Sequence, residues 1–103
     1  LKKKWHLNMS NRFTFKNLNL KVDNLGIQRT RLSFGPKYGL SIIKEPNKTY
    51  YEIGALVNNE LTELPGITAD GDTVQAGLSP DDINTIIVKM QTISASEPKE
   101  ENV

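Results

Sequence analysis

Hydrophobic and polar residues alternate over several short stretches of the chain, a period of two that is typical of half-buried β-strands. Early in the chain the alternation changes parity: Phe13 and Phe15 share one face, whereas Leu18 and Leu20 share the other. A shift of one residue turns the apolar side chains to the opposite face of a strand. We therefore expect a strand from position 11 onward and a second one after a turn or bulge at residues 16–17.

Residues 27–34 form the next predicted strand. Thr30, Leu32 and Phe34 fall on one of its faces, and Arg29 and Arg31 fall on the other. A Gly-Pro pair follows and ends this strand, because proline cannot donate a hydrogen bond to a neighbouring strand.

Residues 38–44 and 49–57 are predicted to form a hairpin, because both are strand-like and a short turn containing Pro46 separates them. Asn58 and the asparagine after it predict a tight turn, since asparagine tolerates the positive φ that such turns require. That turn leads into a short strand at residues 60–64, which a Pro-Gly pair ends.

The last regular element is a helix over residues 80–92. Ser79 is a favoured N-cap, proline is tolerated at the first helical position, and the two aspartates that follow suit the helix N-terminus. Its apolar residues recur with helical spacing and are Ile83, Ile86, Ile87 and Met90. The sequence thus predicts an α+β fold in which a small antiparallel β-sheet of four to five strands packs against one C-terminal α-helix.

The chain of 103 residues fits one domain, which we expect to span residues 11–93. Residues 1–10 are interpreted as an N-terminal extension in which Met9 is a candidate native start, and they are set aside from the fold. Residues 94–103 are small, polar and acidic and are predicted to be a disordered tail. Only 37% of the residues are hydrophobic, so formation of a homo-oligomer is an easy way to bury more surface.

The net charge of +1 hides an uneven distribution. Residues 1–50 carry eleven Lys and Arg against Asp23 and Glu45, a net charge of +9, whereas residues 51–103 have a net charge of −8. Such segregation marks either a surface for nucleic acid or an acidic protein, or two halves that fold against each other and cancel. We expect the second, since a sheet interleaves its strands.

Few residues support catalysis or metal binding. The absence of cysteine excludes thiol nucleophiles and thiolate metal sites, and the only histidine, His6, lies in the N-terminal extension. The acids at positions 52, 60 and 63 are interpreted as solvated, and those at positions 70 and 72 as part of a turn. We therefore predict a protein that is not an enzyme and that uses no cofactor and no metal.

Two binding hypotheses remain. A basic face of the N-terminal strands could follow a nucleic-acid backbone, with a nearby aromatic residue to stack on bases. Its candidate residues are Arg12, Lys16, Arg29, Arg31, Lys37 and Lys44. A protein partner is the other hypothesis, because aromatic side chains are enriched at protein interfaces and three tyrosines gather around one predicted hairpin. These candidate residues are Tyr38, Tyr50 and Tyr51.

No apolar run in the sequence approaches the ~20 residues that span a bilayer, and the N-terminus has no apolar signal core. We expect a protein that does not associate with membranes. A cytoplasmic location is predicted.

Four stretches resemble small uncharacterised proteins of tailed bacteriophages. The stretches are Tyr-Gly-Leu-Ser-Ile-Ile-Lys from Tyr38, Tyr-Tyr-Glu-Ile-Gly-Ala-Leu from Tyr50, residues 67–75, and Leu-Ser-Pro-Asp-Asp-Ile from Leu78. The resemblance covers about residues 34–92. It implies a phage-encoded accessory protein that acts in the host cytoplasm, and it implies no catalytic residues. The leading hypothesis is thus a non-enzymatic, phage-type accessory protein that binds a host or phage protein, and the alternative is a nucleic-acid-binding module.

Overall fold

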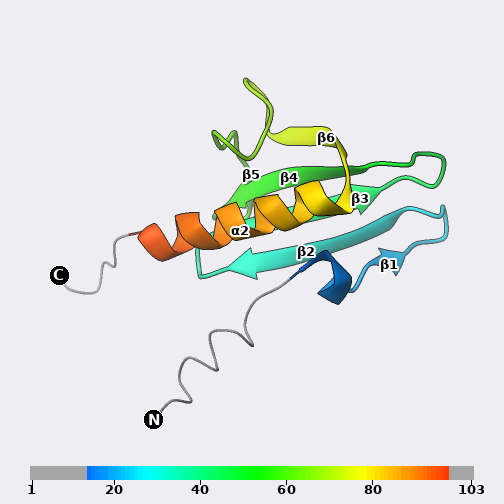
Figure 1. Ribbon diagram of the computed structural model, residues 1–103, viewed down its shortest axis with the longest axis horizontal. Helices are drawn as coiled ribbons and strands as arrows, with labels where there is room; N and C mark the ends of the chain where they lie inside the picture. The colour runs from blue at the N-terminus through cyan, green and yellow to red at the C-terminus, as the bar shows by residue number, and fades with distance from the viewer. Residues whose placement is uncertain (1–13, 98–103) are drawn as a thin grey trace, which may run out of the picture.

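Six antiparallel strands form one sheet in the part of the chain that the computed structural model describes, residues 14–97 (Figure 1). The strands follow the order β1-β2-β3-β4-β5, and β6 pairs with β4 on the same side as β5. The strands are β1 (Lys21–Val22), β2 (Gln28–Phe34), β3 (Tyr38–Lys44), β4 (Tyr51–Val57), β5 (Glu60–Leu61) and β6 (Val74–Leu78). A 3-10 turn, η1 (Phe15–Asn17), precedes them and one helix, α2 (Pro80–Ser96), follows them.

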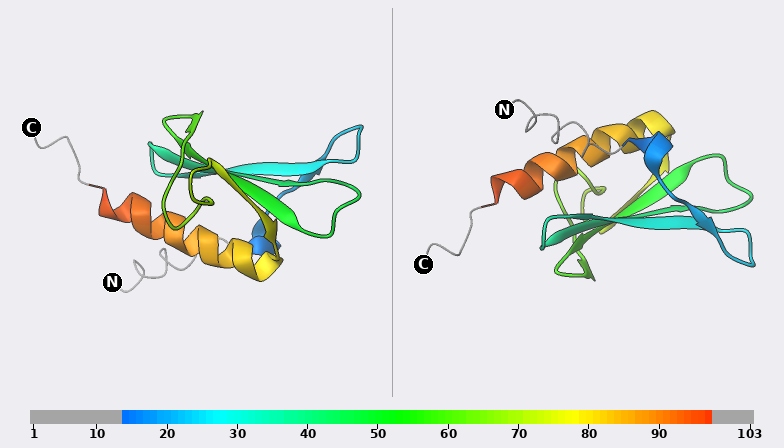
Figure 2. Two further views of the ribbon diagram at one scale, coloured as in Figure 1. Left: turned by 90° about the horizontal axis from the view of Figure 1, so that it is seen from above. Right: turned by 90° about the horizontal axis from the view of Figure 1, so that it is seen from below.

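Helix α2 covers one face of this sheet, and Figure 2 shows that it lies on that side only. Its buried residues are the apolar set that helical spacing predicted, Ile83, Ile86, Ile87 and Met90. From the sheet they meet Phe34, Leu40, Ile42, Ile53, Ala55 and Leu78, together with Ile67 from the loop before β6. The predicted α+β class, an antiparallel sheet against one C-terminal helix, is confirmed.

The face of the sheet opposite α2 carries no helix in the described part of the chain, and two glycines let leucines lie flat on it. A Cβ on Gly39 would lie 3.4 Å from Leu56, and a Cβ on Gly54 would lie 2.9 Å from Leu61 Cδ2. Leu56 is buried there outside the main core. We call this surface the open face.

The strand predicted from position 11 is wrong where the structure describes it, because residues 15–17 form the 3-10 turn η1. Thr14 and Asn17 form a capping box around this turn, and such local hydrogen bonds compete with an extended backbone. The turn predicted at residues 16–17 is confirmed. Leu18 and Leu20 after it pack against the core, although β1 itself begins only at Lys21.

Two asparagines make the tight turn after β4, as predicted: Asn58 has φ 54° and Asn59 has φ 69°. Strand β5 is shorter than the predicted 60–64, because the chain leaves the sheet after Thr62, whose N–H donates to the carbonyl of Ala55 at 2.9 Å. The backbone N–H of Leu64 donates to Thr68 Oγ1 at 3.0 Å, and Ile67 enters the core. Strand β6 was not predicted.

Helix α2 begins as expected and ends later than expected. Ser79 Oγ accepts from the N–H of Asp82 at 3.1 Å, and Asp82 Oδ2 accepts from the N–H of Ser79 at 2.9 Å. The predicted end at residue 92 is wrong, because the helix continues to Ser96. Ser94 Oγ donates to the Phe34 carbonyl at 2.8 Å and holds this last turn against β2. The start of the predicted tail is therefore helical, and residues 98–103 lie outside the described part.

Candidate functional site

Strand β2 has a strand neighbour on both sides for only part of its length. Strand β1 pairs with Gln28 and Arg29 alone, whereas β3 pairs with every residue of β2. Within residues 14–97, positions 30–34 thus form a free edge of the sheet.

The hydrogen bonds beside β2 show where the backbone groups of this edge point. The N–H of Asp23 donates to the carbonyl of Ile27 at 3.0 Å, so the carbonyl of Ile27 points away from β3. The N–H of Asn58 donates to the carbonyl of Lys37 at 2.8 Å, so the odd-numbered residues of β3 direct these groups toward β4 and the even-numbered ones direct them toward β2. The N–H and C=O groups of successive residues point to opposite sides of a strand. The backbone N–H and C=O groups of the odd-numbered residues of β2 therefore point away from β3. Arg31 and Ser33 therefore direct their backbone N–H and C=O groups outward, beyond the first residue of β1, Lys21.

A groove with a volume of about 410 Å³ lies along this edge. One wall is residues 17–19 with Lys21, and the other wall is residues 29–32 of β2. The two walls diverge because η1, from which the first wall continues, lies against α2, while β2 stays in the sheet. We call this feature the β2 edge groove.

Three cations line the β2 edge groove, and no acidic residue is part of its lining. Arg29 and Arg31 are exposed on the open face, as the alternation along β2 predicted. Lys21 stands directly opposite Arg29 in the β1–β2 pair. Lys21 was not predicted as a site residue, because the register between β1 and β2 was needed to place it.

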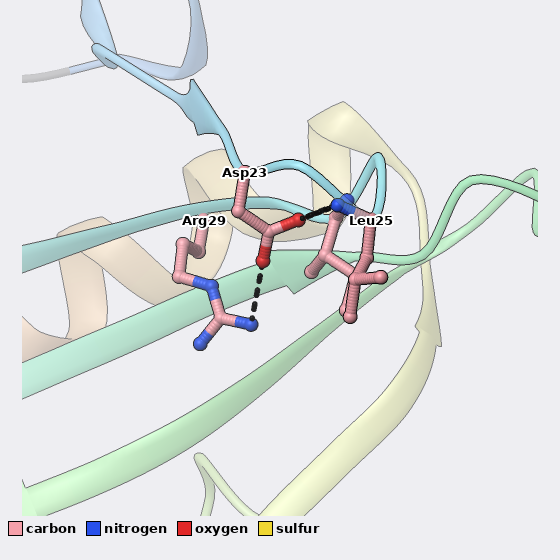
Figure 3. A network of polar contacts seen from close by, with 4 residues as sticks. Asp23, Leu25 and Arg29 are labelled. Carbon is pink, nitrogen blue, oxygen red and sulfur yellow. Dashed lines mark hydrogen bonds and ion pairs between the residues drawn. The ribbon is translucent and has the colours of Figure 1, made fainter.

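Asp23 shapes the hairpin beside this groove (Figure 3). Its carboxylate accepts from the N–H of Leu25 at 2.9 Å and of Ile27 at 3.0 Å, and it forms an ion pair with Arg29 at 3.4 Å. The bond from Ile27, then that from Leu25, hold the pKa of Asp23 below its usual value, and Arg29 adds a smaller effect. Asp23 thereby fixes the turn and partly neutralises Arg29.

Among the residues that the structure describes, the other predicted cations do not join Arg29 and Arg31. Lys16 is exposed on η1, and Arg12 lies outside the described residues. Lys37 is at the far end of β2, where its Nζ is 3.3 Å from Glu97 Oε2. Lys44 is half-buried at the end of β3 and shares the helix-side parity of the buried Ile42. Of the five predicted cations that the structure describes, the β2 edge groove therefore gathers two, Arg29 and Arg31, together with Lys21.

The three tyrosines of the predicted protein-binding surface do not form one surface. Tyr38 donates through its hydroxyl to Glu97 Oε1 at 3.2 Å, at the end of the sheet where α2 stops. Tyr51 is half-buried at the opposite end, packed against the core. Tyr50 alone is exposed, and the hydrogen bond that its hydroxyl accepts from Lys48 at 3.2 Å raises the pKa of that lysine.

Opposite charges stand at opposite edges of the sheet. The expectation that the sheet interleaves the two halves is wrong, because the strand order follows the chain from β1 to β5. The basic residues of the groove therefore stay at the β1–β2 edge. Exposed acids gather on β5 and the loop after it, and they are Glu60, Glu63, Asp70 and Asp72.

The acidic residues act as acceptors in turns. Glu63 Oε2 accepts from the N–H of Gly71 at 2.8 Å, and Asp72 Oδ1 accepts from the N–H of Thr73 at 2.7 Å. The described residues contain no group of three or more His, Cys, Asp or Glu side chains that could hold a metal ion.

A second groove, with a volume of about 490 Å³, lies on the outer surface of α2 between Asn84 and Ser96. Thr14, the first described residue, contributes to its lining. The β2 edge groove, which lies between two described segments and has a free backbone edge, is therefore the better-defined candidate site.

Comparisons of the chain with protein-family models, with curated proteins and with solved structures find no match. Within residues 14–97, no helix has the length and apolar character needed to cross a bilayer. The candidate site is therefore interpreted from its own geometry.

Proposed function

We propose that this chain is a non-enzymatic binding domain that engages a protein partner by accepting one of the partner's strands at the edge of β2. The outward N–H and C=O groups of Arg31 and Ser33 carry the proposal. In strand addition, backbone hydrogen bonds supply affinity and the flanking side chains supply specificity. The β2 edge groove supports this mode, because it offers a free backbone edge together with a lined space beside it.

The resemblance to small proteins of tailed bacteriophages extends the proposal. On that basis the protein is a phage-type accessory protein, and its partner is a host or phage protein met in the host cytoplasm.

Replacement of Ser33 tests this proposal. Ser33→Pro removes the outward N–H but keeps the bonds between β2 and β3, and proline is tolerated on edge strands. Ser33→Ala is the matched control, because it keeps the N–H and removes only an exposed hydroxyl. The wild-type chain and both variants are immobilised and exposed to the same bacterial extract, and the retained proteins are identified by mass spectrometry.

The proposal expects a protein that is retained by the wild type and by Ser33→Ala and is lost from Ser33→Pro. Equal retention on all three, with an unchanged urea midpoint for Ser33→Pro, would place binding elsewhere on the molecule.

Nucleic-acid binding is the second candidate, and one observation favours it: Lys21, Arg29 and Arg31 gather on one side of the sheet. Two observations weigh against it. Asp23 already pairs with Arg29. Tyr38 and Tyr51, which could stack on bases, lie on the face of the sheet that α2 covers. Binding to labelled DNA or RNA that falls steeply between ~50 and ~200 mM salt and is lost in Arg31→Ala would favour this candidate instead.

A further inference from the structure

We infer that the strand added to β2 is an extended acidic segment in which acidic residues alternate with β-branched apolar residues. This inference rests on the proposed function and names the chemistry of the partner at the same site. It follows from the different character of the two sides of the β2 edge groove.

The open-face side of the groove is basic. Arg31 and Lys21 are exposed and form no ion pair with any other described residue, whereas Arg29 shares its charge with Asp23. An added strand places every second side chain on this face, beside Arg31. Acidic side chains at those positions gain attraction, while basic ones are repelled.

The helix side of the groove is apolar at two positions and carries Thr30 of β2 beside them. Leu18 lines one wall and Leu32 the other, and both are half-buried against the core. The remaining side chains of an added strand point to this side, because successive side chains alternate between the faces of a sheet. Branched apolar residues there extend the core and favour an extended backbone.

The free edge sets the length of the segment. Residues 30–34 rise about 17 Å along the strand, so roughly five partner residues pair with them. A short linear stretch of a partner protein is sufficient to fill this space.

The same charges disfavour a second copy of this chain as the occupant. Antiparallel pairing of two β2 edges places both Arg31 side chains on the same face of the joint sheet, and neighbouring like charges destabilise such pairs. An acidic partner relieves this repulsion.

The test uses the full chain and three capped eight-residue peptides, with alternating Glu and Val, alternating Lys and Val, or alternating Glu and Ser. At ~50 mM salt, we expect the Glu-Val peptide to bind at least ~10-fold more tightly than either of the others. Arg31→Glu should abolish or reverse the preference for Glu-Val over Lys-Val. Lys89→Glu makes the same charge change on the exposed side of α2 and should leave the preference unchanged.

Amide hydrogen exchange on the unaltered chain locates the peptide without any substitution. The N–H groups of Arg31 and Ser33 should exchange quickly in the free chain and slow at least ~10-fold when the Glu-Val peptide is bound. Slowing elsewhere in the sheet without these two amides would overturn the inference.

Two other occupants have distinct outcomes, and both overturn the inference. If the exchange of these two amides slows when the chain is concentrated without peptide, a second copy of the chain occupies the edge. If the two amides exchange slowly in the free chain and quickly after removal of residues 98–103, the chain's own acidic C-terminal segment occupies the edge.

The two proposals fail separately. If an extract protein is retained in a Ser33→Pro-sensitive way but the Glu-Val peptide has no advantage, the inference fails and the proposed function stands. If neither the extract nor any peptide responds to Ser33→Pro, strand addition at β2 is wrong.

Discussion

The backbone N–H of Phe15 donates a hydrogen bond to the side-chain oxygen of Asn84, with 2.6 Å between the two heavy atoms. This bond joins η1 to helix α2 across most of the chain. The ring of Phe15 then stands edge-on to Tyr51, with 5.0 Å between the ring centroids. The segment that η1 starts continues as one wall of the β2 edge groove, so Asn84 helps to position the candidate site.

Asn84→Ala should lower the free energy of unfolding by about 1–3 kcal/mol, because it leaves the partly buried N–H of Phe15 without its acceptor. Urea denaturation followed by circular dichroism measures the change. Thr85→Ala, at the exposed neighbouring position, is the control and should stay within about 0.5 kcal/mol of wild type. Equal urea midpoints for Asn84→Ala and wild type would show that another group anchors η1.

Alternation along the chain predicted the faces of β2 correctly. Thr30, Leu32 and Phe34 lie toward the helix and Arg29 and Arg31 away from it, since this outcome depends only on backbone geometry. Strand β6 could not be predicted in the same way. Its backbone includes Gly77 at φ 75°, and its pairing with β4 shifts register, so tertiary contact defines it.

The candidate site was only partly predictable. The pairing register between strands brings its residues together, and the spacing of these residues along the sequence does not reveal that register. The tyrosines illustrate this limit: Tyr38 and Tyr51 belong to one hairpin, yet Tyr38 pairs with Val57, six positions further along β4 than Tyr51. That offset corresponds to about 20 Å along the strand. The free edge of β2 was equally hidden, because it depends on β1 beginning only at Lys21, which pairs with Arg29.

Ser79→Ala should destabilise the protein by about 1 kcal/mol, because the N–H of Asp82 loses the side-chain acceptor that caps α2. Ser96→Ala is the matched control at the other end of the helix, where the hydroxyl only donates to the carbonyl of Thr92. Thermal unfolding followed at the helix band of the circular dichroism spectrum compares the two. A control that loses as much stability as Ser79→Ala would contradict the role of the cap.

Gly35→Ala should cost more stability than Gly71→Ala. Both glycines have positive φ, 72° and 75°, so alanine strains either position by about 1–2 kcal/mol. A Cβ at position 35 would also lie 2.7 Å from Ser94 Oγ, whereas nothing lies within 4 Å of one at position 71. Urea denaturation of both variants in wild-type and Ser94→Ala backgrounds tests this contact. The excess cost at position 35 should shrink once Ser94 is alanine, and an unchanged excess would refute the clash.

Acid should remove the stability that Asp23 contributes to the β1–β2 hairpin. Because the folded protein holds the pKa of Asp23 below 3.8, the unfolded chain binds more protons as the pH falls from that value to the folded pKa. The contribution is therefore complete above the ordinary pKa and is lost as the pH falls through the folded one. The difference in unfolding free energy between wild type and Asp23→Asn should shrink over this range.

The carboxyl signal of Asp23 in a nuclear magnetic resonance titration should show a midpoint below 3.8. In Arg29→Gln most of this depression should remain, because the N–H groups of Ile27 and Leu25 are its main causes. A midpoint restored to the ordinary value in that variant would assign the effect to the ion pair instead.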